Sequence, residues 1–169
     1  GLLLLTDEPE LVDRLLHPRH RHRRRYLVQV EGTPDDPALE RLRRGGLDIR
    51  GHRTLPCRAR LLRSEPDLPP RDPPIRERRE IPAPWLMMEL REGKNRQVRR
   101  MTAAVGLPTL RLVRCRIDLM DGGEALDLND LPAGRWRSVT NAEQERLNRL
   151  LSSRVPRPRS AGQGADRRG

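Results

Sequence analysis

Residues 92–101, EGKNRQVRRM, gather the side chains in this chain that are best suited to bind a polyanion. Gly93 permits a turn and Asn95 can cap a helix, and the arginines that follow would project from the first helical turns. Free backbone N–H groups at a helix start also favour phosphate. The segment therefore predicts a phosphate-binding helix start. The alternative is a solvated basic helix face, because short runs of charge are common.

The whole chain is basic, and its positive charge comes almost entirely from arginine. Its 169 residues have a formal net charge of +11, and Lys94 is the single lysine. Guanidinium groups bind phosphate through paired hydrogen bonds and stack on bases. No run of about 18 apolar residues and no basic amphipathic helix of membrane type is present. We therefore expect RNA or DNA as the partner, ahead of an anionic membrane surface, and no membrane association.

Neither the cysteines nor the histidine-rich segment indicates a metal or another cofactor. Cys57 and Cys115 are far apart, and no secretory signal precedes them. We expect reduced thiols in a cytoplasmic protein, with a disulfide as the alternative. The segment 17–22, HPRHRH, lacks the spacing of a four-ligand zinc site, and the chain contains no CxxC. We expect these histidines to face solvent or RNA.

Hydrophobic periodicity and turn signals predict short helices alternating with strands. The predicted helices cover residues 7–16, 35–44, 95–106 and 140–151. The predicted strands cover residues 2–5, 26–30, 54–62, 85–90, 109–119 and 134–139. In residues 109–119, TLRLVRCRIDL, the alternation would turn Leu110 and Leu112 to the core and Arg111 to solvent or a nucleic acid.

Two segments have a composition that excludes regular structure. Residues 64–84 are rich in proline and charge, so we expect an insertion loop without helix or strand. Residues 152–169 combine Pro, Ser, Gly and Arg without an apolar pattern, which predicts a disordered basic tail. We therefore expect one domain over residues 1–151. Because it opens on GLLLLTDEPE, we expect the chain to be a fragment that begins inside an element.

Several ordered blocks together resemble the RsuA-type ribosomal RNA pseudouridine synthases, and within them most closely the large-subunit RluE group. The blocks are GLLLLTD, RRYLVQVEG followed by DDPALERLRRG, PPIRERREIP, and EGKNRQVRRMTAAVGLPTLRLVR. They span residues 1 to about 140. Any single block would be weak support, but their order makes chance agreement remote.

This resemblance implies an α+β fold, the pseudouridine-synthase catalytic fold, in which helices flank a twisted, mainly antiparallel sheet. It implies a cleft where a flipped uridine of large-subunit (23S) rRNA is isomerised to pseudouridine, with no cofactor and no metal. In the family an aspartate acts as the nucleophile. It lies in a GRLDxDxxG-like motif whose last glycine matches Gly1, so we expect it upstream of this chain, which would then be N-terminally truncated and inactive alone. Asp7 follows the apolar run and is expected to cap a helix instead.

The resemblance also assigns roles to individual residues. Arg99 matches the arginine that pairs with the catalytic aspartate, and Tyr26 matches the tyrosine that packs on the target base and assists proton transfer. Arg24 stands where the family has the lysine of a K-x-Y pattern. Leu112 would line the uracil pocket, although a leucine at an inward strand position is more often plain core. The residues expected to contact phosphate or cap the helix are Lys94, Asn95, Arg96, Gln97 and Arg100.

Two alternatives from other classes remain at this stage. A non-catalytic basic module that only binds RNA would explain the charge and the basic segment. A ribosomal-protein-like structural component would explain the charge, but not why Tyr26, Arg99 and the ordered blocks occur together. For the parent protein we expect a pseudouridine synthase that is cytoplasmic and monomeric.

Overall fold

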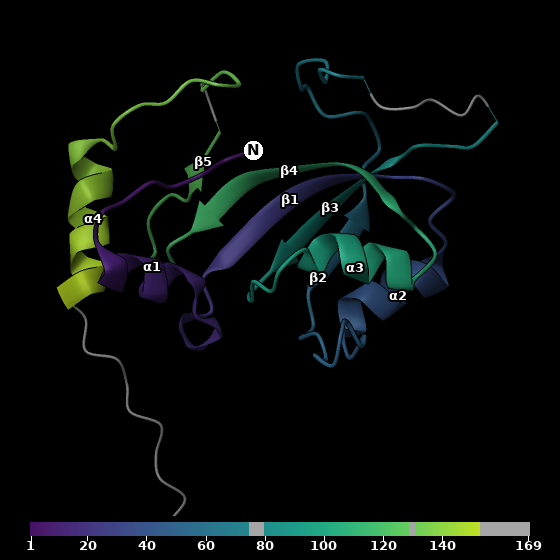
Figure 1. Cartoon of the computed structure of the whole chain (residues 1–169), viewed down its shortest axis with the longest axis horizontal. Coiled ribbons are helices and arrows are strands. Elements are labelled where there is room, and N and C mark those ends of the chain that lie inside the picture. Colours follow the sequence, from purple (N-terminus) through teal and green to yellow (C-terminus); the bar gives the residue numbers. More distant parts are fainter. Residues whose placement is uncertain (75–79, 129–130, 153–169) are drawn as a thin grey trace, which may run out of the picture.

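The computed structural model describes residues 1–74, 80–128 and 131–152, and its strands form one five-stranded sheet (Figure 1). The strand order is β2-β3-β1-β4-β5, and each neighbouring pair is antiparallel. The strands are β1 Arg23–Val30, β2 Arg58–Leu61, β3 Trp85–Leu90, β4 Thr109–Asp118 and β5 Leu126–Asp127. The helices are α1 Pro9–Leu16, α2 Asp36–Arg44, α3 Gln97–Ala104 and α4 Asn141–Ser152, with a 3-10 turn at Pro18–His20. This confirms the predicted α+β class with a mainly antiparallel sheet.

The helices pack on one face of the sheet in two groups, one near each end (Figure 1). Leu42 of α2 and Met101 of α3 are fully buried in a cluster with Val28 of β1. The second cluster joins α1 and α4 to Ile117 of β4. Ile117 pairs with Arg24, which shares a face with Val28 because side chains alternate along a strand. We call this side the helical face and the opposite side, which carries Arg25, the back face.

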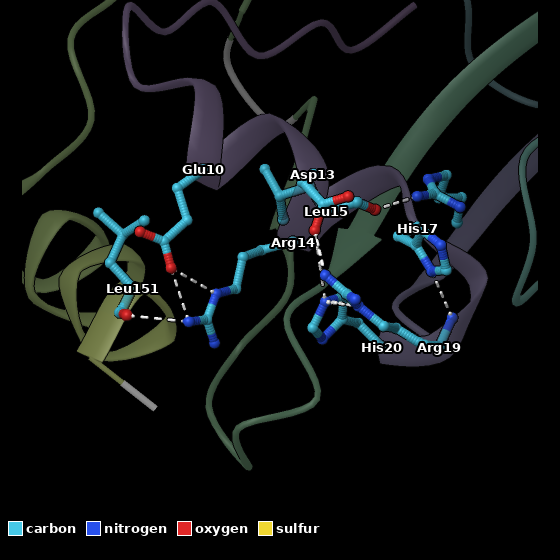
Figure 2. A network of polar contacts seen from close by, with 9 residues as sticks. Glu10, Asp13, Arg14, Leu15, His17, Arg19, His20 and Leu151 are labelled. Atoms are coloured by element: carbon cyan, nitrogen blue, oxygen red, sulfur yellow. Dashed lines mark hydrogen bonds and ion pairs between the residues drawn. The ribbon is translucent and has the colours of Figure 1, made fainter. Parts of the chain in front are cut away.

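A polar network fixes the second group of helices (Figure 2). The guanidinium of Arg14 in α1 donates to the carboxylate of Glu10 at 2.7 Å and to the backbone carbonyl of Leu151 in α4 at 3.1 Å. Figure 2 shows these groups side by side between the two helices. Arg14 is buried, so its charge is compensated by the contacts that join α1 to α4.

The ends of α2 and α4 follow the signals in the sequence, whereas the expected cap Asp7 is wrong: α1 follows Glu8, and no side chain caps it. The Asp35 side chain accepts a hydrogen bond from the backbone N–H of Ala38 at 2.8 Å, and Gly45 ends α2 with a φ of 70°. Before α4, Thr140 and Glu143 exchange hydrogen bonds at 2.7 and 3.2 Å, as a capping box requires. The predictions for these helices, and for the strand 85–90, are confirmed.

Two predicted strands are wrong. In residues 2–5, Leu2 is buried and its N–H bonds to the Arg114 carbonyl at 2.6 Å, but Leu3 and Leu5 are exposed and no strand forms. Residues 134–139 also form no strand, and the sheet instead ends with β5. Both segments lack the continuous ladder of backbone hydrogen bonds that a strand needs.

The alternation of β4 is interrupted at Cys115. Tyr26 pairs with Arg114, and the preceding residue, Arg25, pairs with Arg116, so Cys115 is an extra residue in the ladder. Arg114 consequently lies on the helical face and Arg116 on the back face. The prediction that Arg111 faces solvent is also incomplete, because its guanidinium lies 5.8 Å from the centre of the Trp85 ring.

The proline-rich insertion 64–84 contains no helix or strand in its described parts, 64–74 and 80–84. The Leu62 N–H bonds to the Trp85 carbonyl at 2.8 Å, so the two ends of the insertion lie side by side. The predicted tail lies outside the described residues from 153 onward. Among the residues described, no helix is long and apolar enough to span a membrane.

Candidate functional site

The basic segment 92–101 is organised around the carboxylate of Glu92, which is 2% exposed. This carboxylate accepts hydrogen bonds from the Gln97 amide at 2.5 Å and from the Leu55 backbone N–H at 2.7 Å, and it contacts His52 Nε2 at 2.8 Å. Gln97 in turn accepts from the Lys94 backbone N–H at 2.8 Å. These contacts hold the turn before α3 in one conformation, so the basic side chains project from a fixed backbone.

The start of α3 differs from the prediction. Arg96 adopts a left-handed φ of 52° and precedes the helix, which begins at Gln97 without a side-chain cap. Asn95 does not cap the helix, because its side-chain oxygen accepts a hydrogen bond from the Arg100 guanidinium at 3.1 Å. Lys94, Asn95 and Arg96 are exposed, so they are available to a ligand.

Further arginines gather beside this turn from distant parts of the chain. Partial desolvation, followed by the charges of Arg96 and Arg71, lowers the pKa of Arg99. Partial desolvation and the charges of Arg50 and Arg96 likewise lower the pKa of Arg100. Guanidiniums crowded in this way disfavour one another's charge, and a bound anion would relieve that repulsion. The sequence analysis missed Arg50 and Arg71, which are brought to the turn by tertiary folding and have no local signal.

Arg99 is fixed at the start of β4. Its guanidinium donates to the Thr109 carbonyl at 3.1 Å, and the Thr109 and Thr102 hydroxyls are 2.7 Å apart. In the part of the chain that the structure describes, the contacts of Arg99 include no carboxylate and no contact with Tyr26. Its guanidinium therefore has capacity for an anionic partner.

Tyr26 and Leu112 lie on the helical face at the edge of the α2–α3 cluster, both half-buried. Tyr26 pairs with Arg114, whose guanidinium donates to the Leu2 carbonyl at 2.7 Å. A Cβ on Gly1 would stand 2.6 Å from the Arg114 backbone nitrogen, so the first residues lie directly against this strand. The structure thus brings the tyrosine, the leucine and the start of the chain to one strip of the sheet.

Two predicted site residues are buried. Arg24 is 4% exposed and donates to the Leu15 carbonyl, and burial lowers its pKa. It braces α1 against β1 rather than facing a phosphate. Gln97 is also 4% exposed, and its contacts with Glu92 and Lys94 make it a support of the turn. Glu92 itself was not predicted, although a lone acid between a strand and a glycine could have indicated its role.

The described residues include no group of three or more His, Cys, Asp or Glu side chains that could hold a metal. Contrary to the expectation that the histidines face solvent or RNA, His22 is buried at 5% exposure, and this burial lowers its pKa. Cys57 and Cys115 are free thiols. Burial raises the pKa of Cys57 to about 12, so the group is neither a ready metal ligand nor a nucleophile.

Comparison with known proteins gives consistent results. The model of the family described as RNA pseudouridylate synthase matches residues 1–104. The chain is 50% identical over 137 residues to ribosomal large subunit pseudouridine synthase E of Xanthomonas campestris, covering 81% of this chain and 70% of that protein. It is 43% identical over 140 residues to synthase E of Vibrio vulnificus, covering 83% and 56% respectively. A crystal structure of a pseudouridylate synthase superposes with a TM-score of 0.61 at 26% identity, covering 84% of this chain and 52% of that one.

Proposed function

We propose that this chain, which belongs to the RNA pseudouridylate synthase family, binds RNA and positions the target uracil. The reaction it serves is the conversion of a uridine in large-subunit rRNA to pseudouridine. The names of its relatives support the substrate class. The observation that carries the proposal is the fixed, cationic turn at residues 93–96 with Arg99 beside it, next to the same sheet face that carries Tyr26 and Leu112.

The proposed roles follow from exposure and chemistry. Tyr26 packs on the flipped uracil, and Leu112 lines the pocket, because an aromatic ring with an apolar neighbour suits a base face. Exposed Lys94, Asn95 and Arg96, together with Arg100, bind backbone phosphates, while the buried Arg24 and Gln97 hold the surrounding backbone. A ribosomal RNA substrate implies a cytoplasmic protein, and the free thiols agree with a reducing compartment.

Arg99 is the proposed partner of the aspartate nucleophile. An arginine within a few ångströms keeps a carboxylate ionised and oriented, lowering its pKa by about 1–3 units. In a longer chain, residues before Gly1 would continue from the position beside Arg114, the strand partner of Tyr26. An aspartate in that preceding segment would approach Tyr26 and Arg99 from the side of Arg114. Among the described residues Arg99 contacts no carboxylate, so its guanidinium can take such an aspartate as its partner.

The alternative function is a basic module that binds RNA and catalyses nothing. Tritium release from uridine-labelled large-subunit rRNA separates the two. We expect release only from a version extended upstream through its own reading frame, with rRNA binding by both versions. Binding by both without release from either would support the module. Release by the short chain would show that the proposed position of the nucleophile is wrong.

A further inference from the structure

The back face of the sheet carries a row of charged residues that the proposed reaction does not use. The strand register aligns Arg116 of β4 with Arg25 of β1, Arg25 with Glu89 of β3, and Glu89 with Arg58 of β2. Arg25 and Arg116 are direct cross-strand partners, and like charges in that position destabilise a sheet. The row therefore has an electrostatic cost in the isolated protein.

Glu89 compensates only part of this charge. Its carboxylate is 8% exposed and lies 3.0 Å from Arg25, 3.4 Å from Arg58 and 3.6 Å from Arg23. On the other side of the row, Asp127 of β5 pairs with Arg116. Asp118 of β4 is likewise the strand partner of Arg23. With Arg91, which follows β3 at the same end of the sheet, five arginines accompany three carboxylates on this part of the back face. The arginines are still in excess, and a bound phosphate would reduce that excess.

Two of these arginines also have donors without a protein partner. Arg23 Nε and Arg116 Nε are buried, and neither has a hydrogen-bond acceptor among the described residues. Buried polar groups are nearly always hydrogen-bonded in folded proteins. Guanidinium donors are best satisfied by the several oxygens of a phosphate. Of the two, only Arg23 also lines a cavity, and its chemistry favours an anionic ligand there.

This cavity of about 220 Å³ adjoins Arg23, but not Arg116, at the edge of the sheet where β2 begins and β3 ends. Its lining consists of Arg23, Pro56, Cys57, Arg58, Glu89 and Arg91. Arg58 is mostly exposed and Arg91 is exposed, so the cavity is accessible from solvent. In the chain, Arg91 directly precedes the basic segment 92–101.

We propose that this cavity binds a backbone phosphate of the RNA, next to β2 and on the opposite face of the sheet from Tyr26. This inference rests on the proposed function, because it takes the occupant to be RNA. The RNA would pass around the exposed edge of β2, with its target nucleotide on the helical face and a flanking phosphate among Arg23, Arg58 and Arg91. Such a contact adds affinity and fixes orientation without reading the base.

The test is the salt dependence of binding to a large-subunit rRNA transcript. The double variant Arg58→Gln/Arg91→Gln is compared with Arg44→Gln/Arg149→Gln, which removes the same charge from exposed positions outside the cavity. Each lost phosphate contact reduces the slope of log K against log[salt] by about 1. We expect a slope reduced by about one to two and an affinity several-fold weaker at low salt in the cavity variant alone.

Equal changes in both double variants, or no change in either, would overturn the proposed site. Thermal unfolding midpoints verify that the variants fold. If the double variant unfolds, Arg91→Gln alone, which has no contact with Glu89, must still reduce the slope by about 1. Tritium release by the upstream-extended protein is measured in parallel. Tritium release together with equal salt-dependence slopes for the two double variants would refute the cavity site and leave the proposed function intact. A reduced slope in the cavity variant without tritium release would count against the proposed function only.

Discussion

The single residue on which the basic turn depends most is Glu92, since its buried carboxylate contacts the helix start, a backbone N–H and His52. Replacing it with glutamine keeps the shape but puts an N–H₂ group where two donors already point. A buried group left unsatisfied costs about 1–3 kcal/mol. We expect Glu92→Gln to lower the free energy of unfolding by about that amount and to weaken rRNA binding. Urea unfolding and a binding titration measure both.

The control for this variant is Glu40→Gln on α2, where the carboxylate is about half exposed and lies 3.7 Å from Arg43. Surface ion pairs contribute about 0–1 kcal/mol, so the control should change neither quantity appreciably. Similar losses in the two variants would mean that net charge, rather than the buried contacts of Glu92, sets the behaviour of the turn.

Cys57 offers a second prediction at the residue scale. Burial raises its pKa to about 12, so almost no thiolate is present at pH 8. In a Cys115→Ser background, we expect Cys57 to react with a thiol-specific disulfide reagent at least about 100-fold more slowly in the folded than in the urea-unfolded protein. Rapid reaction of the folded protein would contradict the burial of this side chain.

At the element scale, α4 should lose its anchoring in acid. Hydrogen bonds from Arg137 lower the pKa of Glu143 from 4.5 to about 2, and those from Arg146 lower the pKa of Asp121 to about 2. A carboxyl group whose pKa is lower in the folded state stabilises the fold at pH values above its unfolded-state pKa. This stabilisation is lost as the pH falls through its folded-state pKa. We expect the thermal midpoint to fall between about pH 4.5 and pH 2.

Glu143→Gln should reduce that pH dependence. Glu145→Gln, on the same helix but mostly exposed and 4.0 Å from Arg149, should leave it unchanged. Circular dichroism melts across the pH range compare the three proteins. A profile for Glu143→Gln that coincides with that of the unaltered chain would show that the Arg137 contact does not anchor α4.

The elements that the sequence predicted well are those whose signals are local. Asp35 with Gly45, and Thr140 with Glu143, mark helix ends through contacts only a few residues long. The wrong predictions concern segments whose conformation depends on strands that are distant in the sequence. The bulge at Cys115 depends on the register with β1, and Leu2 found a single backbone partner on β4 instead of a full ladder.

The same distinction holds for the candidate site. Lys94, Arg96 and Arg100 belong to one short motif and were found from it, whereas Arg50 and Arg71 join that surface only after folding. The burial of Arg24 could not be foreseen, because the Leu15 carbonyl that receives its guanidinium is contributed by a separate helix.

At the scale of the whole molecule, the insertion 64–84 is separable from the sheet. The backbone hydrogen bond between Leu62 and Trp85 holds its two ends side by side, and the carbonyls of Ala83 and Pro84 accept hydrogen bonds from β1. Replacing residues 66–80 with a short Gly-Ser linker keeps these contacts. We expect an unfolding midpoint within a few degrees of that of the intact chain and weaker selectivity among rRNA sites in the upstream-extended protein. Mapping of pseudouridines along the rRNA tests this, and unchanged site choice would count against it.

The central claim is that Arg99 serves catalysis while the neighbouring basic residues serve binding, and single-turnover tritium release at saturating rRNA tests it most directly. In the upstream-extended protein, loss of one preorganised charge from a reacting site typically costs about 100- to 1,000-fold in rate. We predict a loss of about that size for Arg99→Gln with rRNA affinity nearly unchanged, and weaker binding with a normal rate for Arg100→Gln. Near-normal release by Arg99→Gln at saturating rRNA would contradict the account.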